Sequence, residues 1–174
     1  MTTIIAKENN GEVIIGFDSL VSGGESFEME QDKVFVNNGV IYGVAGRLLL
    51  STEIKHARMP SPPTEVSDTD GWVSSTLSPK IRHILNTVNP RRGQDEFGMQ
   101  ILVVVNNRVY EIGCDTAWYR KVDGVYAIGS GSPYASGALS HGATIKDALA
   151  IAAERDSHTG GRLTVTTARR LLSK

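Results

Sequence analysis

The sequence has little of several features that mark particular classes of protein. Its 174 residues include one cysteine, Cys114, so the chain cannot form an internal disulfide, and we expect a reducing compartment. No apolar run approaches the ~20 residues that a membrane-spanning helix needs. The charged pair Lys7-Glu8 lies too close to the start to leave room for the apolar region of a signal peptide. We therefore expect a cytoplasmic protein with no membrane partner.

An excess of charge of either sign is also lacking. The formal net charge of −1 gives no electrostatic attraction for nucleic acid, and the basic pairs at 91–92 and 169–170 are typical of solvated surface. The Gly-rich segment GSGSPY lacks the Lys-Ser/Thr pair of a phosphate-binding loop. The histidines lack zinc-ligand spacing with Cys114; they are His56, His83, His141 and His158. The sequence thus predicts no nucleic-acid partner, no nucleotide and no zinc.

What the sequence does contain is a series of hairpin signals. Three Asn-containing turns, at 9–11, 37–39 and 106–107, each separate two apolar, β-branched runs. Runs such as Val13-Ile14-Ile15 are apolar on both faces, which favours a sheet that is covered on both sides. The polar segment 19–32 is expected to be a loop or an extended edge. We expect strands at 2–6, 12–18, 33–36, 40–46, 99–105, 108–112, 125–128 and 163–167.

Helix signals fall between and after these strands. Apolar residues recur at helical spacing over 72–88, where we expect Ser78 to cap the helix and Pro79 to lie in its first turn. Further helices are expected at 47–59, at 133–140 and after Thr144. Hairpins followed by paired helices predict an α+β fold in which helical layers enclose two stacked antiparallel sheets. The length fits a single domain over 1–174.

Thr2 is a candidate nucleophile. If Met1 is removed, as is usual before a small residue, Thr2 carries both a hydroxyl and a free α-amine. The unperturbed pKa of such an amine, about 7.7–8.0, leaves much of it unprotonated near neutral pH, so one residue is nucleophile and base at once. The first hairpin returns Asp18 to the start of the first strand, so we expect Asp18 beside Thr2. Many proteins begin Met-Thr, however, and Thr2 alone is a weak signal.

Five segments give the sequence a more specific character. They are MTTIIAKENNGEVIIGFDS, DKVF, YGVAG, AIGSGSPYA and RDSHTGG. In order and spacing they resemble the proteasome β-subunit family, especially its HslV-type bacterial homologue. The resemblance covers most of the chain and is weakest between about Leu50 and Gln94. It implies the N-terminal-nucleophile hydrolase fold, a four-layer αββα sandwich formed by one proteasome-β/HslV-like domain over 1–174.

The resemblance also implies a set of catalytic residues. Thr2 would be the nucleophile, with its α-amine as proton acceptor. Asp18 would hold Lys33, whose ammonium group would lower the pKa of that amine. The backbone N–H of Gly46 would stabilise the oxyanion formed during attack. An Asp and a Lys are more often a surface pair of little consequence, and Gly46 could simply end a strand.

Supporting and substrate-binding residues follow from the same resemblance. Ser130, Asp156 and Thr159 would hydrogen-bond the terminal amine and one another, although Asp156 and Thr159 could instead terminate a helix at Gly160. A Ser commonly stands in the family where this chain has Thr159. Two residues, Ser22 and Val44, would line the substrate groove.

The function implied is that of a threonine peptidase that hydrolyses unfolded polypeptides inside stacked homo-oligomeric rings. The chain has no nucleotide motif, so an ATP-dependent unfoldase of the HslU type would be a separate partner. No cofactor is expected, and a structural monovalent cation near Ser130 or Asp156 is an analogy without identified ligands. Two alternatives stay open, namely a catalytically silent ring subunit and a small-molecule amidohydrolase of the same fold.

Overall fold

Two antiparallel sheets form the centre of the computed structural model, which describes residues 2–22, 25–88 and 99–174. The first sheet has the order β10-β1-β2-β11, made of β1 (Thr3–Asn9), β2 (Glu12–Phe17), β10 (Val125–Gly129) and β11 (Thr164–Thr167). The second has the order β5-β6-β7-β8-β9, made of β5 (Val34–Asn37), β6 (Val40–Ala45), β7 (Gln100–Val105), β8 (Arg108–Ile112) and β9 (Trp118–Tyr119). A separate ribbon pairs β3 (Leu20–Val21) with β4 (Phe27–Glu28).

The hairpins form at the three turns that the sequence marks. Each turn places two successive residues at positive φ: Asn10 and Gly11 at 47° and 82°, Asn38 and Gly39 at 50° and 77°, and Asn106 and Asn107 at 51° and 57°. Two positive φ angles are the signature of a type I′ turn, whose twist matches that of the strands it joins. The predicted hairpins β1–β2, β5–β6 and β7–β8 are therefore confirmed.

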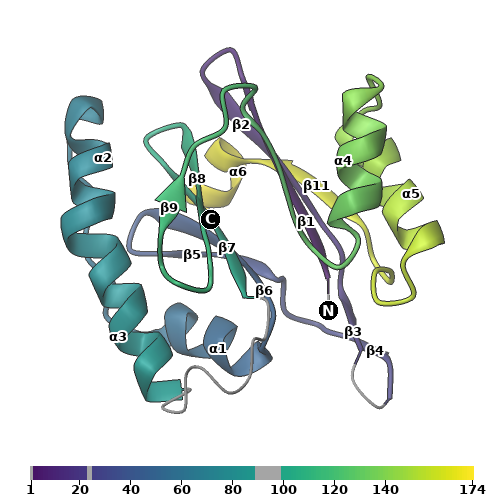
Figure 1. Ribbon diagram of the computed structural model, residues 1–174, viewed down its shortest axis with the longest axis horizontal. Helices are drawn as coiled ribbons and strands as arrows, with labels where there is room; N and C mark the ends of the chain where they lie inside the picture. The colour runs from purple at the N-terminus through teal and green to yellow at the C-terminus, as the bar shows by residue number, and fades with distance from the viewer. Residues whose placement is uncertain (1, 23–24, 89–98) are drawn as a thin grey trace.

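Helices cover the outer face of each sheet, as Figure 1 shows. The second sheet is covered by α1 (Leu48–His56), α2 (Thr69–Trp72) and α3 (Ser78–Val88). The first sheet is covered by α4 (Ser132–Ser140) and α5 (Ile145–Arg155). The short C-terminal helix α6 (Ala168–Leu172) packs against β2, β11, β5 and β6. This arrangement is the predicted four-layer αββα sandwich.

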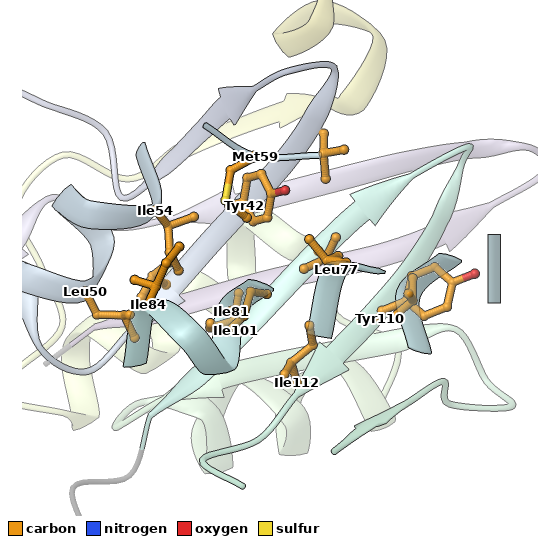
Figure 2. Close-up of a cluster of buried hydrophobic side chains, with 14 of the residues drawn as sticks. Tyr42, Leu50, Ile54, Met59, Leu77, Ile81, Ile84, Ile101, Tyr110 and Ile112 are labelled. Atoms are coloured by element: carbon orange, nitrogen blue, oxygen red, sulfur yellow. The ribbon is translucent and has the colours of Figure 1, made fainter. Parts of the chain in front are cut away.

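Three buried clusters correspond to the three interfaces between these layers. Figure 2 shows the largest, where Leu50, Ile54 and Ile81 of the helices meet Ile101 and Ile112 of the second sheet. The cluster between the sheets includes Ile4, Phe17, Ile41 and Val104. The third lies under α4 and α5 and includes Ile5, Ala148 and Leu149. Because Ile4 and Ile5 point to opposite faces of β1, both faces of this strand are buried, as its continuous apolar run predicted.

The helix around Pro79 differs from the prediction. Ser78 does not cap a helix, because the chain is already helical from α2 through a π-helical turn at Val73–Leu77 into α3. The buried Ser78 hydroxyl instead donates to the carbonyl oxygen of Thr116 at 2.6 Å. Burying Val73 and Leu77 contributes roughly 1.5–3 kcal/mol each, against about 1 kcal/mol for an N-cap. The π-turn also precedes the proline, which has no N–H to donate to a regular turn.

Other differences are smaller. The polar segment expected as a loop or extended edge contains the short strands β3 and β4, and β9 was not anticipated. The residues after 167, of which only the basic pair at 169–170 was interpreted, form α6, which contributes Ala168 and Leu171 to the cluster between the sheets. The other basic pair, at 91–92, lies outside the described residues.

Replacing Ile81 by Ala tests the packing of α3 on the second sheet. The side chain is fully buried in the cluster of Figure 2, and truncations of this kind cost roughly 2–5 kcal/mol. We expect the free energy of unfolding, measured in urea, to fall by that amount. His83→Ala, an exposed change on the same helix, should alter it by less than about 0.5 kcal/mol. Equal effects of the two variants would contradict the packing described.

Candidate functional site

Three polar residues meet where strands of both sheets begin or end. Thr2 directly precedes β1, Asp18 directly follows β2, and Lys33 directly precedes β5. Because β1 and β2 are antiparallel, with Ile4 opposite Phe17, the start of one lies beside the end of the other. All three residues are buried, with 3%, 0% and 5% of their surface exposed. The predicted proximity of Asp18 and Thr2 is confirmed.

These three side chains form one hydrogen-bonded group. The Lys33 Nζ donates to Thr2 Oγ1 at 2.6 Å and lies 3.0 Å from each carboxylate oxygen of Asp18. It also donates to the carbonyl oxygen of Leu20. The Thr2 hydroxyl, in turn, donates to Asp18 Oδ1. An ion pair this buried and this closely bonded to a hydroxyl is not the solvated surface pair that an Asp and a Lys usually form.

The backbone holds the Asp18 carboxylate in place. Its Oδ1 accepts from the N–H of Thr3 at 2.9 Å, and its Oδ2 accepts from the N–H groups of Leu20 and Gly160, both at 3.2 Å. These donors come from three separate parts of the chain. The carboxylate therefore has a fixed orientation toward Lys33, with hydrogen bonds that offset part of the cost of its burial.

Burial lowers the pKa of the Lys33 amine below its ordinary value. The negative charges of Asp18 and Asp156 and the hydrogen bond to Asp18 act in the opposite direction without cancelling that effect. The lysine therefore binds its proton less tightly than an exposed lysine does. Chemically, the group presents a buried cation to the oxygen of Thr2.

A second polar cluster surrounds Asp156, at the C-terminal end of α5. Its Oδ2 accepts from Ser130 Oγ and from Thr159 Oγ1, both at 2.6 Å. The Thr159 hydroxyl also bonds that of Thr3 at 2.7 Å, which connects the cluster to the residue after Thr2. The structure thus brings Ser130, Asp156 and Thr159 together. Asp156 is also the C-cap of α5, which ends at Arg155 and not, as the alternative interpretation had it, at Gly160.

Asp156 is held in its charged form. Burial by itself would raise its pKa, but the hydrogen bonds from Ser130, Thr159 and the His158 N–H lower the pKa below the ordinary value. The hydroxyls therefore face a carboxylate at neutral pH, and each must act as donor toward it.

A cavity of about 220 Å³ opens at the Thr2 group. Five of the residues singled out in the sequence line it: Thr2, Ser22, Lys33, Val44 and Gly46. The others are Val21, Met29, Arg47, Leu48 and Ser51. Ser130, Asp156 and Thr159 lie outside this lining. Gly46 directly follows β6 and has a φ of 127°, a conformation that side-chain-bearing residues rarely adopt.

Sequence reasoning missed several residues of the site. Thr3 was not singled out, although its place beside Thr2 on a strand with two buried faces was a usable signal. His158 bonds Ser22 Oγ through Nδ1 at 2.9 Å, a contact across 136 positions of sequence that no local pattern indicates. Met29 and Leu48, which line the cavity, were missed for the same reason, because only the folded chain brings them there.

Two general features of the described chain complete the picture. Within residues 2–22, 25–88 and 99–174, no group of three or more His, Cys, Asp or Glu side chains could hold a metal ion. In the same ranges no helix has the length and apolarity needed to cross a membrane. The monovalent cation considered near Ser130 or Asp156 stays a prediction.

Comparison with known proteins identifies the fold. No protein-family model matches the sequence, and no curated protein does. Among solved structures, Thiobacillus denitrificans BPH has a TM-score of 0.71 at 18% identity, covering 95% of this chain and 96% of that one. The same protein in complex with epoxomicin gives 0.70 at 16%, covering 95% and 97%. Eukaryotic HslV from Trypanosoma brucei gives 0.63 at 18%, covering 95% and 98%. The chain has the HslV-type fold, as the resemblance predicted.

Removing one partner of the buried ion pair tests its role. We expect Lys33→Met to lower the free energy of unfolding by about 3–5 kcal/mol, because it leaves the Asp18 carboxylate buried without its cation. The double variant Asp18→Asn/Lys33→Met carries no charge at either position, so its free energy of unfolding should fall by less. Lys146→Met, an exposed change on α5, serves as the control in the same urea titration. A single variant as stable as the double variant would contradict this account.

Proposed function

We propose that this chain is a threonine peptidase of the HslV type, with Thr2 as its N-terminal nucleophile once Met1 has been removed. One observation carries the proposal. The Thr2 hydroxyl is bonded to a buried Lys33–Asp18 pair and lines a cavity at the same time. A threonine that served only to begin a strand would need neither a buried cation nor an open space beside its oxygen.

The chemistry begins with the transfer of a proton. The free α-amine of Thr2 accepts the proton of the Thr2 hydroxyl, and the oxygen attacks the carbonyl carbon of a peptide bond. The Lys33 cation, 2.6 Å from Thr2 Oγ1, stabilises the negative charge that develops on that oxygen. It also lowers the pKa of the amine, so that more of the amine is free to accept a proton at neutral pH.

The tetrahedral intermediate then collapses. Its oxyanion accepts a hydrogen bond from the Gly46 N–H at the edge of the cavity, an interaction whose loss typically costs ~10²–10³ in rate. The protonated amine of Thr2 donates its proton to the leaving nitrogen, and the carbon–nitrogen bond breaks to leave an acyl ester on Thr2 Oγ1. Water, deprotonated by the same amine, hydrolyses the ester and restores the hydroxyl.

The Asp156 cluster would orient the amine. The hydroxyls of Ser130 and Thr159 are fixed by the Asp156 carboxylate, and Thr159 is bonded to Thr3, the residue next to Thr2. A terminal amine has three hydrogen-bond donors when charged and one lone pair when neutral, so its direction must be set by neighbours. The fixed hydroxyls of Ser130 and Thr159 and the carboxylate of Asp156 are suitable partners for the amine.

The cavity supports an unfolded polypeptide as the substrate. Strand β3 begins two residues after Asp18, and its last residue, Val21, lines the cavity together with Ser22. An extended peptide would add to this edge through main-chain hydrogen bonds that do not depend on its sequence. Val21, Met29, Val44 and Leu48 give the cavity an apolar wall. We therefore propose a preference for apolar side chains on the acyl side of the cleaved bond.

We further propose that the chain assembles into stacked homo-oligomeric rings, with an HslU-type ATP-dependent unfoldase as a separate partner. Support comes from the shared fold and from apolar side chains exposed near the cavity, since Phe27, Leu48 and Leu49 are 54%, 49% and 52% exposed. Exposed apolar side chains that gather in one patch are typical of surfaces that bind a partner. A cytoplasmic location and the absence of a cofactor belong to the same proposal.

The intact mass of the purified chain, followed by a peptide-hydrolysis assay, tests the function. We expect a mass short by one methionine and hydrolysis of a permanently unfolded polypeptide, because both require the free amine of Thr2. Thr2→Ala should abolish the hydrolysis, and epoxomicin, which was solved bound to one structural neighbour, should inhibit it.

Two results would overturn the proposal. Hydrolysis that persists in Thr2→Ala would show that another residue is the nucleophile. A correctly processed chain that cleaves no polypeptide would favour the alternatives, and a screen of small amides would then separate an amidohydrolase from a catalytically silent ring subunit.

A further inference from the structure

Gln100 connects the two sheets at the end of the sandwich where the candidate site lies. It is the first residue of β7 and pairs with Ala45 of β6, the residue directly before Gly46. Its side-chain Oε1 accepts from the N–H of Gly129 at 3.0 Å, and Gly129 is the last residue of β10 in the other sheet. One side chain therefore reaches from the strand beside Gly46 to a strand of the sheet that carries Thr2.

Gly129 is in turn packed directly on Thr2. It pairs with Thr3 in the β1–β10 register, and its φ is 90°. A Cβ atom placed on Gly129 would lie 2.0 Å from the carbonyl oxygen of Thr2, so the two backbones are in contact with no room for a side chain. A shift of Gly129 is consequently transmitted to the backbone that carries the Thr2 hydroxyl.

Glu111 fixes the orientation of the Gln100 amide. It lies on β8, diagonally across from Gln100, and only 3% of it is exposed. Its Oε1 accepts from Gln100 Nε2 at 3.2 Å, and its Oε2 lies 3.4 Å from Lys121 Nζ. A carboxylate only accepts hydrogen bonds and a backbone N–H only donates, so the amide must turn its NH₂ to Glu111 and its oxygen to Gly129.

From these contacts we propose that Gln100 is a positioning residue, oriented by Glu111, that sets the spacing between the Thr2 oxygen and the Gly46 N–H. The Gln100 side chain touches Gly129 beside Thr2, and its backbone is paired beside Gly46, so Gln100 links the two halves of the reacting geometry. It does not line the cavity, and its effect on the reaction is through the two backbones. This inference rests on the proposed peptidase function.

Steady-state kinetics of Gln100 variants test this proposal. Gln100→Met keeps the length of the side chain and removes both hydrogen bonds. Because small misplacements of reacting groups cost up to about 10² in rate, we expect kcat to fall by about 10- to 100-fold, with KM within about twofold. Gln100→Glu should be at least as damaging, since it places two carboxylates face to face. Glu154→Gln, exposed on α5, is the control for a lost carboxylate and should leave kcat unchanged.

The double variant Gln100→Glu/Glu111→Gln supplies a rescue. In it the carboxylate at position 100 accepts from both the Gly129 N–H and the amide at position 111, so donors and acceptors match again. We expect kcat within about threefold of the unmodified chain when every variant is assayed well below its unfolding temperature. A double variant no better than Gln100→Glu, or a Gln100→Met variant with normal kcat, would overturn the proposal.

Amide hydrogen exchange separates this inference from the proposed function, because it needs no catalysis. In Gln100→Met we expect faster exchange at Gly129 and also at Thr3 and Gly46, with normal rates restored in the double variant. Faster exchange at Gly129 alone would reduce Gln100 to a local strand-end contact and overturn the proposal. If the unmodified chain hydrolyses no peptide while exchange behaves as expected, the proposed function fails and the coupling between the sheets stands.

Discussion

The buried ion pair between Lys33 and Asp18 is the interaction on which the rest of the site depends. Removing two charges from water costs several kcal/mol for each ion, and their attraction repays this only when the geometry is good and the remaining hydrogen bonds are made. Here Asp18 receives backbone N–H groups from three parts of the chain, and Lys33 also donates to Thr2 and to Leu20. A pair of apolar residues would fill the same space at lower cost. A buried charge next to a hydroxyl is what the proposed chemistry of Thr2 requires.

The four-layer sandwich explains how such a pair can be built. Thr2 and Asp18 lie at adjacent strand ends in one sheet, whereas Lys33 and Gly46 lie at adjacent strand ends in the other. The apolar cluster between the sheets fixes their separation, with the outer helices excluding water from both outer faces. The site is therefore positioned by the two sheets, and the Gln100 side chain crosses between them near Thr2 and Gly46.

Much of this could be predicted from the sequence, for physical reasons that differ between residues. The hairpins follow from Asn-containing turns, and the first hairpin alone brings Asp18 to Thr2. The positions of Lys33, Gly46 and the Asp156 cluster came from the resemblance of short motifs. The helix at Pro79 was mispredicted because a local cap signal was weighed without the burial of Val73 and Leu77. The His158–Ser22 and Gln100–Gly129 contacts join positions far apart in sequence, and hydrogen bonds of that kind leave no periodic pattern in a single chain.

The most direct test of the central claim is to trap the acyl ester on Thr2. The chain would be mixed with a peptide aryl ester, which acylates the nucleophile faster than the acyl ester is hydrolysed. The reaction would be quenched in acid, the protein digested, and its N-terminal peptide analysed by mass spectrometry. The account predicts an acyl adduct on a peptide that begins with Thr2, located on the side-chain oxygen. An adduct on any other residue, or continued turnover with Thr2 still preceded by Met1, would contradict it.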